Sequence, residues 1–294
     1  MSKFLPEIAI IFGTMIWGAT FMWVKEGISY LDPAYFIGLR FLLAFIFLLI
    51  IFPTKRNLSK NEIKIGVLIG ITLFFAYITQ TIGLKYTTIS NNAFITGLFV
   101  VFVPFVSFLF KEENISLITI LGTLMAAMGL YLLSFSGSGI GSINIGDLLT
   151  LLCAVLFAVQ IVLVGRYTKK YDPVKLLIVQ IFTVSILALF VSFIMGTYTF
   201  SLKYGAIKSI TLNAILGTAV AYYIQNKFQH KMPNTKAGLI FSLEPVFAGI
   251  FAYIFKGEVL SFTQIIGAAL IFLAIVIIQV KGIKQNIESA REVI

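Results

Sequence analysis

The stretch AGLIFSLEPVFAGIFAYIF, residues 237–255, is an apolar run that contains one charged residue, Glu244. A helix that crosses a bilayer needs about 20 mostly apolar residues, so the run is long enough to span a membrane. Pro245 follows Glu244, lacks a backbone N–H and crowds the preceding turn, which predicts a kink near the centre of this helix. Polar backbone at membrane depth is tolerated only against protein or water, so we expect this part of the helix to face inward.

The rest of the chain has the same character. Its 294 residues are 59% hydrophobic and 12% charged, whereas a soluble domain has about 25% charged residues. The runs lack the period-two alternation of barrel strands, so we predict an all-α polytopic membrane protein with ten transmembrane helices. The ten predicted runs are 7–24, 34–52, 65–85, 91–110, 117–135, 146–165, 174–195, 211–229, 237–255 and 262–281.

The positive charge follows the expected topology. The formal net charge is +10, and the 22 Lys and Arg residues lie almost entirely between the apolar runs. With a cytoplasmic N-terminus, 16 of them fall on the cytoplasmic side, 5 on the other side, and Arg40 lies inside a run. This bias predicts that both termini are cytoplasmic, and it explains the charge without a nucleic-acid partner. We expect an integral protein of a prokaryotic cytoplasmic (inner) membrane.

The sequence also contains an internal repeat. LDPAYFIGLRF (31–41) is similar to YDPVKLLIVQI (171–181), and AYITQ (76–80) is similar to AYYIQ (221–225). These ordered matches predict two copies of a five-helix unit, residues 1–137 and 138–294. Because five is odd, the second copy must be inverted in the membrane. Inverted repeats are typical of secondary transporters, whose substrate site lies near the midplane between the repeats.

Four motifs resemble those of one known family. They are WGATF (17–21), DPAYFIGLRFLLA (32–44), TGLFVVFVPF (96–105) and SLEPVFAGIFAYIFKGE (242–258). Over nearly its whole length the chain resembles the EamA-type transporters of the drug/metabolite transporter superfamily. The resemblance implies ten helices in two inverted repeats around a central cavity, and export of small metabolites such as amino acids. The first-half counterpart of Glu244-Pro245 is Phe99-Val100, so the acidic motif occurs once.

Aromatic and amide residues recur at the centre of the predicted helices. At 1.5 Å per residue, Trp17, Tyr77 and Tyr222 fall close to the middle of a core about 30 Å thick. We predict a midplane cavity with aromatic walls, suited to a small zwitterion or amphiphile. The alternative is that these side chains only pack between helices. The predicted substrate-binding residues are Trp17, Thr20, Tyr77, Gln80, Asn92, Thr96, Gln160, Tyr222 and Gln225.

Arg40, Glu244 and Pro245 are predicted to act in gating or coupling. Charged groups inside a membrane are costly and are functional by default. Arg40 is suited to a substrate carboxylate or to helix-end carbonyls, although a long Arg side chain can also extend to the membrane surface. If transport is coupled to protons, Glu244 would have to carry them.

The leading interpretation is a secondary active transporter that works by alternating access and exports a small metabolite. A multidrug or cation antiporter is the alternative, although the first span, Ile8 to Val24, holds no carboxylate. An intramembrane enzyme of lipid metabolism would need several acidic or histidine residues at one interface, so we do not expect an enzyme. With one Cys and one His, no metal site or cofactor is expected. The expected partners are a small-molecule substrate and the lipid bilayer.

Overall fold

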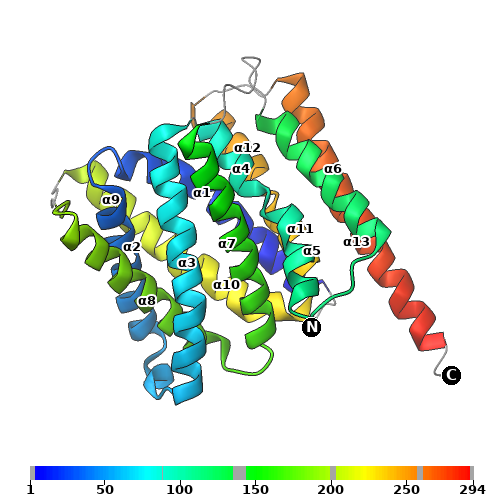
Figure 1. Ribbon diagram of the computed structural model, residues 1–294, viewed down its shortest axis with the longest axis horizontal. Helices are drawn as coiled ribbons and strands as arrows, with labels where there is room; N and C mark the ends of the chain where they lie inside the picture. The colour runs from blue at the N-terminus through cyan, green and yellow to red at the C-terminus, as the bar shows by residue number, and fades with distance from the viewer. Residues whose placement is uncertain (1–3, 88, 135–143, 199–202, 257–260, 292–294) are drawn as a thin grey trace.

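The computed structural model describes residues 4–87, 89–134, 144–198, 203–256 and 261–291, and these residues contain helices and no strand (Figure 1). Eight helical stretches are long and apolar enough to cross a membrane, and two shorter apolar helices lie at 117–132 and 262–278. The prediction of an all-α polytopic membrane protein is confirmed. Lys3 and the predicted boundary between residues 137 and 138 lie outside the described residues.

The helices follow the predicted runs closely. Before the boundary they are α1 (Leu5–Gly27), α2 (Pro33–Ile51), the 3-10 turn η1 (Pro53–Arg56), α3 (Lys60–Tyr86), α4 (Ile89–Gly97), α5 (Phe99–Leu109) and α6 (Leu117–Ser134). After it they are α7 (Ile145–Tyr167), α8 (Pro173–Ile194), α9 (Tyr204–Leu212), the π-helix η2 (Asn213–Val220), α10 (Ala221–Phe228), the 3-10 turn η3 (Gln229–Lys231), α11 (Asn234–Phe241), α12 (Glu244–Lys256) and α13 (Phe262–Arg291).

The repeated Asp-Pro motif starts α2 and α8 in the same way. The Asp32 carboxylate accepts the backbone N–H of Ala34 at 3.0 Å, and Asp172 accepts that of Val174 at 2.9 Å. In each helix the next residue is proline, whose missing N–H costs nothing in the first turn. The motif is thus a helix N-cap, which explains why it recurs at the start of both helices.

Helix α3 lies between α7 and α8, and α2 packs against α8, while α6 and α13 lie side by side at one edge of the molecule (Figure 1). Gly66 and Gly70 of α3 allow the close approach to α8. A Cβ at these positions would come within 2.5 Å of Val179 and 2.6 Å of Thr183. Small residues at such contacts are the usual means of packing helices in lipid, where apolar burial gives no net driving force.

Two membrane crossings are broken near their middle. Leu98 separates α4 from α5, and Ser242 and Leu243 separate α11 from α12. The bend predicted near Pro245 is therefore found as a two-residue turn, Ser242 and Leu243, that interrupts the regular helix between α11 and α12. Proline is favourable in the first turn of a helix and unfavourable inside one, so the chain ends α11 and starts α12 at Glu244. Discontinuous helices of this kind form the substrate sites of many secondary transporters.

The crossings run between two faces, which we call the Glu7 face, where α1 begins, and the Lys25 face, where α1 ends. On the Glu7 face the described residues form five ion pairs: Lys55–Asp172, Arg166–Glu112, Lys169–Glu112, Lys175–Glu62 and Lys236–Glu7. On the Lys25 face the ion pairs include Lys85–Asp32 and Lys208–Glu26.

The Glu7-face pairs include the shortest ones. Lys55 lies 2.5 Å from Asp172, and Lys236 lies 2.6 Å from Glu7, whereas the two pairs named on the Lys25 face are 3.4 Å or longer. Burial acts to raise the pKa of Asp172, but hydrogen bonds from Lys55 and two backbone N–H groups hold the pKa below its usual value. The Glu7 face therefore carries short, partly buried ion pairs. That this face is cytoplasmic stays a prediction.

Candidate functional site

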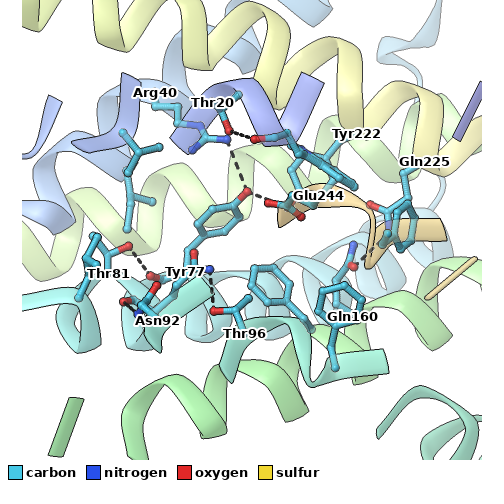
Figure 2. A pocket seen from close by; sticks show the side chains of 18 of the residues that line it. Thr20, Arg40, Tyr77, Thr81, Asn92, Thr96, Gln160, Tyr222, Gln225 and Glu244 are labelled. Carbon is cyan, nitrogen blue, oxygen red and sulfur yellow. Dashed lines mark hydrogen bonds between the residues drawn. The ribbon is translucent and has the colours of Figure 1, made fainter. Parts of the chain in front are cut away.

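A central cavity lies between α1, α2, α3, α4, α7 and the breaks in the fourth and ninth crossings (Figure 2). It takes in about 1060 Å³ of space free of protein atoms, including its open mouth. Val24, Lys25 and Leu84 line it close to the ends of α1 and α3, so the mouth is toward the Lys25 face. All nine predicted substrate-binding residues line the cavity, together with Arg40 and Glu244. Pro245 is outside the lining and follows Glu244 in the first turn of α12.

Aromatic rings form much of the wall. The Trp17 ring meets Tyr222 edge-on at 5.1 Å and Phe241 at 5.4 Å, measured between centroids. The Tyr222 hydroxyl donates a hydrogen bond to the Tyr77 hydroxyl at 2.9 Å, and Tyr77 meets Phe157 edge-on at 5.6 Å. Tyr77 and Tyr222 are the matched residues of the AYITQ and AYYIQ repeats. These rings therefore both pack between helices and line the cavity.

Arg40 is buried and held against the π-helix. Its Nε donates to the Thr218 hydroxyl at 2.6 Å, and its Nη2 donates to the Gly217 carbonyl at 3.2 Å. The guanidinium also lies 5.2 Å from the centre of the Tyr77 ring, a cation–π distance. Only 3% of the residue is exposed, so its side chain does not extend to the membrane surface.

The π-helix explains this anchoring. A π-turn leaves carbonyl groups outside the regular α-helical ladder, and such turns are frequent at functional sites. The Gly217 carbonyl accepts the Trp17 indole N–H at 2.9 Å as well as Arg40. The sequence analysis anticipated carbonyl partners for Arg40 at a helix end, whereas the structure supplies them from the middle of the eighth crossing.

Glu244 begins α12 and lines the same cavity as Arg40. The two side chains are close enough for a Coulombic interaction but do not form one of the ion pairs. Among the described residues, the Glu244 carboxyl has no ion-pair or hydrogen-bond partner. The cavity thus holds a fixed cationic group and, among the described residues, an acidic group that has no fixed partner.

The smaller polar residues are mostly bonded to the protein. The Thr20 hydroxyl donates to the Trp17 carbonyl at 2.8 Å, as expected of a threonine that satisfies its own helix. Gln80 Nε2 donates to the Thr96 hydroxyl at 3.1 Å, and Asn92 donates to the Gln80 carbonyl at 3.1 Å. These bonds join α3 to α4 and fix the polar side of the cavity.

A buried chain of amides extends from the cavity toward the Glu7 face. Gln225 donates to Gln160 at 3.3 Å and to Gln229 at 2.9 Å. Gln229 donates to the Ile161 carbonyl at 2.5 Å and contacts Asn234, which donates to the Ser107 hydroxyl at 3.1 Å. On this side the cavity is therefore closed by hydrogen-bonded side chains.

Several lining residues were not anticipated from the sequence. Phe99 begins α5 and lines the cavity, as its counterpart Glu244 does from α12. The repeat offset that pairs these two residues was a usable signal for Phe99. No comparable signal marks three other lining residues, Phe241, Thr81 and Lys25. An apolar residue, a small polar residue and a residue at a helix end are all common in membrane helices.

The chain was compared with known protein families. The model of the EamA-like transporter family matches it twice, over residues 5–135 and 144–280. The chain belongs to the EamA-like transporter family. Its family therefore identifies this EamA-like chain as a membrane transporter. The relatives described next include proteins that are named as transporters, which agrees with that assignment.

Relatives of this EamA-like chain occur in archaea, bacteria and plants. An uncharacterized transporter of Archaeoglobus fulgidus is 34% identical over 96% of this chain and 88% of its own length. The uncharacterized transporter YyaM of Bacillus subtilis is 26% identical over 88% of each chain. A WAT1-related chloroplastic protein of Arabidopsis thaliana is 25% identical over 94% of this chain and 69% of its own.

A solved structure titled "Crystal structure of protein" has the same fold. It superposes with a TM-score of 0.80 over 94% of this chain and 97% of its own, at 15% sequence identity. At that identity the likeness shows the fold and nothing of the substrate.

Proposed function

We propose that this chain is a secondary active transporter that exports small metabolites such as amino acids by alternating access. The observation that carries the proposal is the presence of Arg40 and Glu244 in one aromatic-walled cavity. An amino acid carries a carboxylate and an ammonium group, which Arg40 and an ionised Glu244 complement. Aromatic walls add affinity for apolar side chains, as in most small-molecule sites.

We propose further that residues 1–137 and 138–294 are inverted copies of one five-helix unit. The Asp-Pro cap begins α2 on the Lys25 face and begins α8 on the Glu7 face. The two broken crossings likewise run in opposite directions. Equivalent elements in opposite orientation support an inverted repeat. In transporters of this kind, one half rocks against the other and exposes a fixed substrate site first to one side of the membrane and then to the other.

The closed and open ends of the cavity suit this cycle. The mouth is toward the Lys25 face, while the amide chain and five ion pairs close the Glu7 face among the described residues. If the Glu7 face is cytoplasmic, as the charge distribution predicts, this conformation is open to the outside. Proton coupling through Glu244 fits an acidic group that has no fixed partner.

A multidrug or cation antiporter is the competing proposal. Glu244 beside aromatic rings would attract a lipophilic cation, but Arg40 in the same cavity would repel it. The two proposals therefore differ in the charge of the preferred substrate.

Counterflow in proteoliposomes tests the proposal. Vesicles with purified chain, loaded with unlabelled amino acids, should accumulate labelled amino acids above the level in protein-free vesicles. Accumulation of a cationic dye and of no amino acid would favour the antiporter instead. A pH gradient imposed across the same vesicles tests for proton coupling.

A further inference from the structure

Two cationic side chains line the central cavity, and the first of them, Arg40, keeps one nitrogen atom free. Arg40 lies against the π-helix, where its Nε and Nη2 atoms donate hydrogen bonds. Its third nitrogen, Nη1, has no hydrogen-bond partner among the described residues, and it keeps accessible surface. Because Arg40 lines the cavity, Nη1 can donate to an anionic group that is held there.

Lys25 is the second cation. It lies in the last turn of α1, is exposed, and lines the cavity at its mouth. Trp17, Thr20 and Val24 line the cavity from the same helix. Thr20, Val24 and Lys25 follow Trp17 by three, seven and eight residues, a spacing that places all four on one face of a helix. The face of α1 that carries Trp17 at the centre of the cavity therefore ends with Lys25 at the mouth.

The two cations lie at different depths. A Cβ at Gly217 would lie 2.5 Å from the methyl carbon of Thr20 and 3.3 Å from Arg40 Nη2, so the guanidinium is level with Thr20 on α1 (Figure 2). Lys25 follows Thr20 by five residues, or about 7.5 Å toward the mouth at 1.5 Å per residue. A lysine side chain is long and flexible, so its ammonium can meet a second anionic group of a ligand whose first is bound at Arg40.

Lys25 has no ion-pair partner among the described residues. Glu26 and Asp32, which are acidic groups of the same face, are paired with Lys208 at 3.7 Å and with Lys85 at 3.4 Å. Lys85 also lies in the last turn of a helix on this face, but it is paired and lies outside the cavity wall. The charge of Lys25 is therefore available to a ligand in the cavity, and that of Lys85 is not.

The charges of the cavity wall do not cancel. Lys25 and Arg40 carry two positive charges, and Glu244 carries at most one negative charge, so the wall is positive by at least one charge. A neutral zwitterion leaves this positive charge uncompensated, whereas an amino acid with an acidic side chain compensates it. Clefts that are lined by an excess of one charge concentrate ligands of the opposite charge.

We infer that Lys25 selects acidic substrates by binding the side-chain carboxylate of an amino acid such as glutamate or aspartate. In this arrangement Arg40 binds the α-carboxylate, and Glu244 binds the ammonium group. The inference rests on the proposed function for the amino-acid backbone and adds the charge of the side chain. A dicarboxylate that lacks the ammonium group meets Lys25 and Arg40 in the same way.

Two pairs of compounds test the preference for charge. Glutamate and glutamine have nearly the same size and differ by one charge, as do succinate and its monoamide, succinamate. Stabilisation of the purified full chain in detergent against heat, measured over a range of each compound, gives the relative affinities. We expect each acid to bind about three- to tenfold more tightly than its amide at low ionic strength. The difference should shrink in high salt, because Lys25 is exposed.

Three variants of Lys25 test the residue directly. Lys25→Gln removes the charge, so the affinities for acid and amide should come within about twofold of each other. Lys25→Arg keeps the charge and should keep the preference for the acid. Lys25→Glu places a negative charge at the mouth and should reverse the preference. The position is exposed, so we expect all three variants to fold.

Lys85→Gln is the matched control. It removes the same charge from the last turn of a helix on the same face, but outside the cavity wall, so the preference for the acid should be unchanged. An equal loss of preference in Lys85→Gln and Lys25→Gln would overturn the inference, because it would show an effect of the overall charge of this face.

Three further results would overturn the inference: equal affinity for acid and amide in the unchanged chain, no binding of any of the four compounds, or a preference that survives in Lys25→Gln. Counterflow on the same preparation separates these outcomes from failure of the proposed function. A chain that exchanges neutral amino acids without preferring acidic ones keeps its transport role. A chain that binds acids through Lys25 but exchanges nothing keeps only the binding site.

Discussion

Phe99 and Glu244 are matched residues of two broken helices: each begins the second segment of its crossing, and each lines the central cavity. The break is therefore present in both halves of the chain, while the acidic group is present in one. The helix break occurs in both crossings and the acidic group in one of them, which suggests that the break and the acidic group have different roles. The break shapes the cavity, and Glu244 adds chemistry to one side of it.

The first prediction concerns that charge. Glu244→Gln should fold with a stability within about 1 kcal/mol of the parent, because the carboxyl has no hydrogen-bond or ion-pair partner among the described residues to lose. Transport should fall by roughly tenfold and lose its response to a pH gradient, if Glu244 carries the coupled proton. Thermal unfolding in detergent and uptake in proteoliposomes measure the two effects. Uptake that still follows the pH gradient would remove Glu244 from coupling.

The second prediction concerns Arg40. Arg40→Met removes donors to Thr218 and Gly217, and hydrogen bonds to charged groups contribute about 1.5–3 kcal/mol each. We expect a measurable loss of thermal stability and loss of exchange for substrates that carry a carboxylate. Arg40→Lys keeps the charge but cannot make the same paired contacts, so it should restore part of the exchange. Full exchange in Arg40→Met would show that Arg40 only anchors the π-helix.

The third prediction concerns the contact between α1 and α12. A Cβ at Gly18 would lie 2.8 Å from the Glu244 carbonyl and 2.9 Å from the Ala248 nitrogen, both backbone atoms that cannot rotate away. Gly18→Ala should therefore displace the start of α12, lower stability by about 1–3 kcal/mol and reduce transport. Gly13→Ala is the matched control on α1, because its Cβ meets the Ile224 side chain at 3.3 Å. Equal activity of the two variants would contradict a requirement for close packing at Gly18.

The fourth prediction concerns closure of the Glu7 face. Lys236 and Glu7 lie 2.6 Å apart with side chains 16% and 17% exposed, and they join α11 to α1. Glu7→Gln should weaken this contact and increase the fraction of molecules open on that face. A cysteine placed at Thr235, in a chain with Cys153→Ala, should then react faster with an impermeant thiol reagent applied from that face. Replacing Cys153, which is buried, leaves the cysteine at position 235 as the thiol that the reagent labels. An unchanged labelling rate would mean that the ion pair does not hold the face closed.

Much of the fold could be predicted because lipid places strong demands on sequence. A crossing must be apolar for about 20 residues, so its presence is visible in composition alone. The Asp-Pro pairs at 32–33 and 172–173 are visible for a similar reason, since a helix start needs a local cap. The cavity residues Trp17, Tyr77 and Tyr222 were predictable because their depth follows from the rise of a helix.

Other features depended on contacts between distant segments. The break at Ser242 and Leu243 was expected only as a kink, and the π-helix that holds Arg40 was not predicted. The Gly217 carbonyl of this π-helix accepts hydrogen bonds from Arg40 and Trp17, which are both distant from it in the sequence.

The sequence by itself determined that this protein is a bundle of membrane-crossing helices of the EamA-like type, because hydrophobic length and local capping are properties of contiguous residues. The tertiary structure decided which polar side chains share one cavity and which of their atoms remain unpaired. That depends on hydrogen bonds between helices far apart in the chain, which no local pattern encodes.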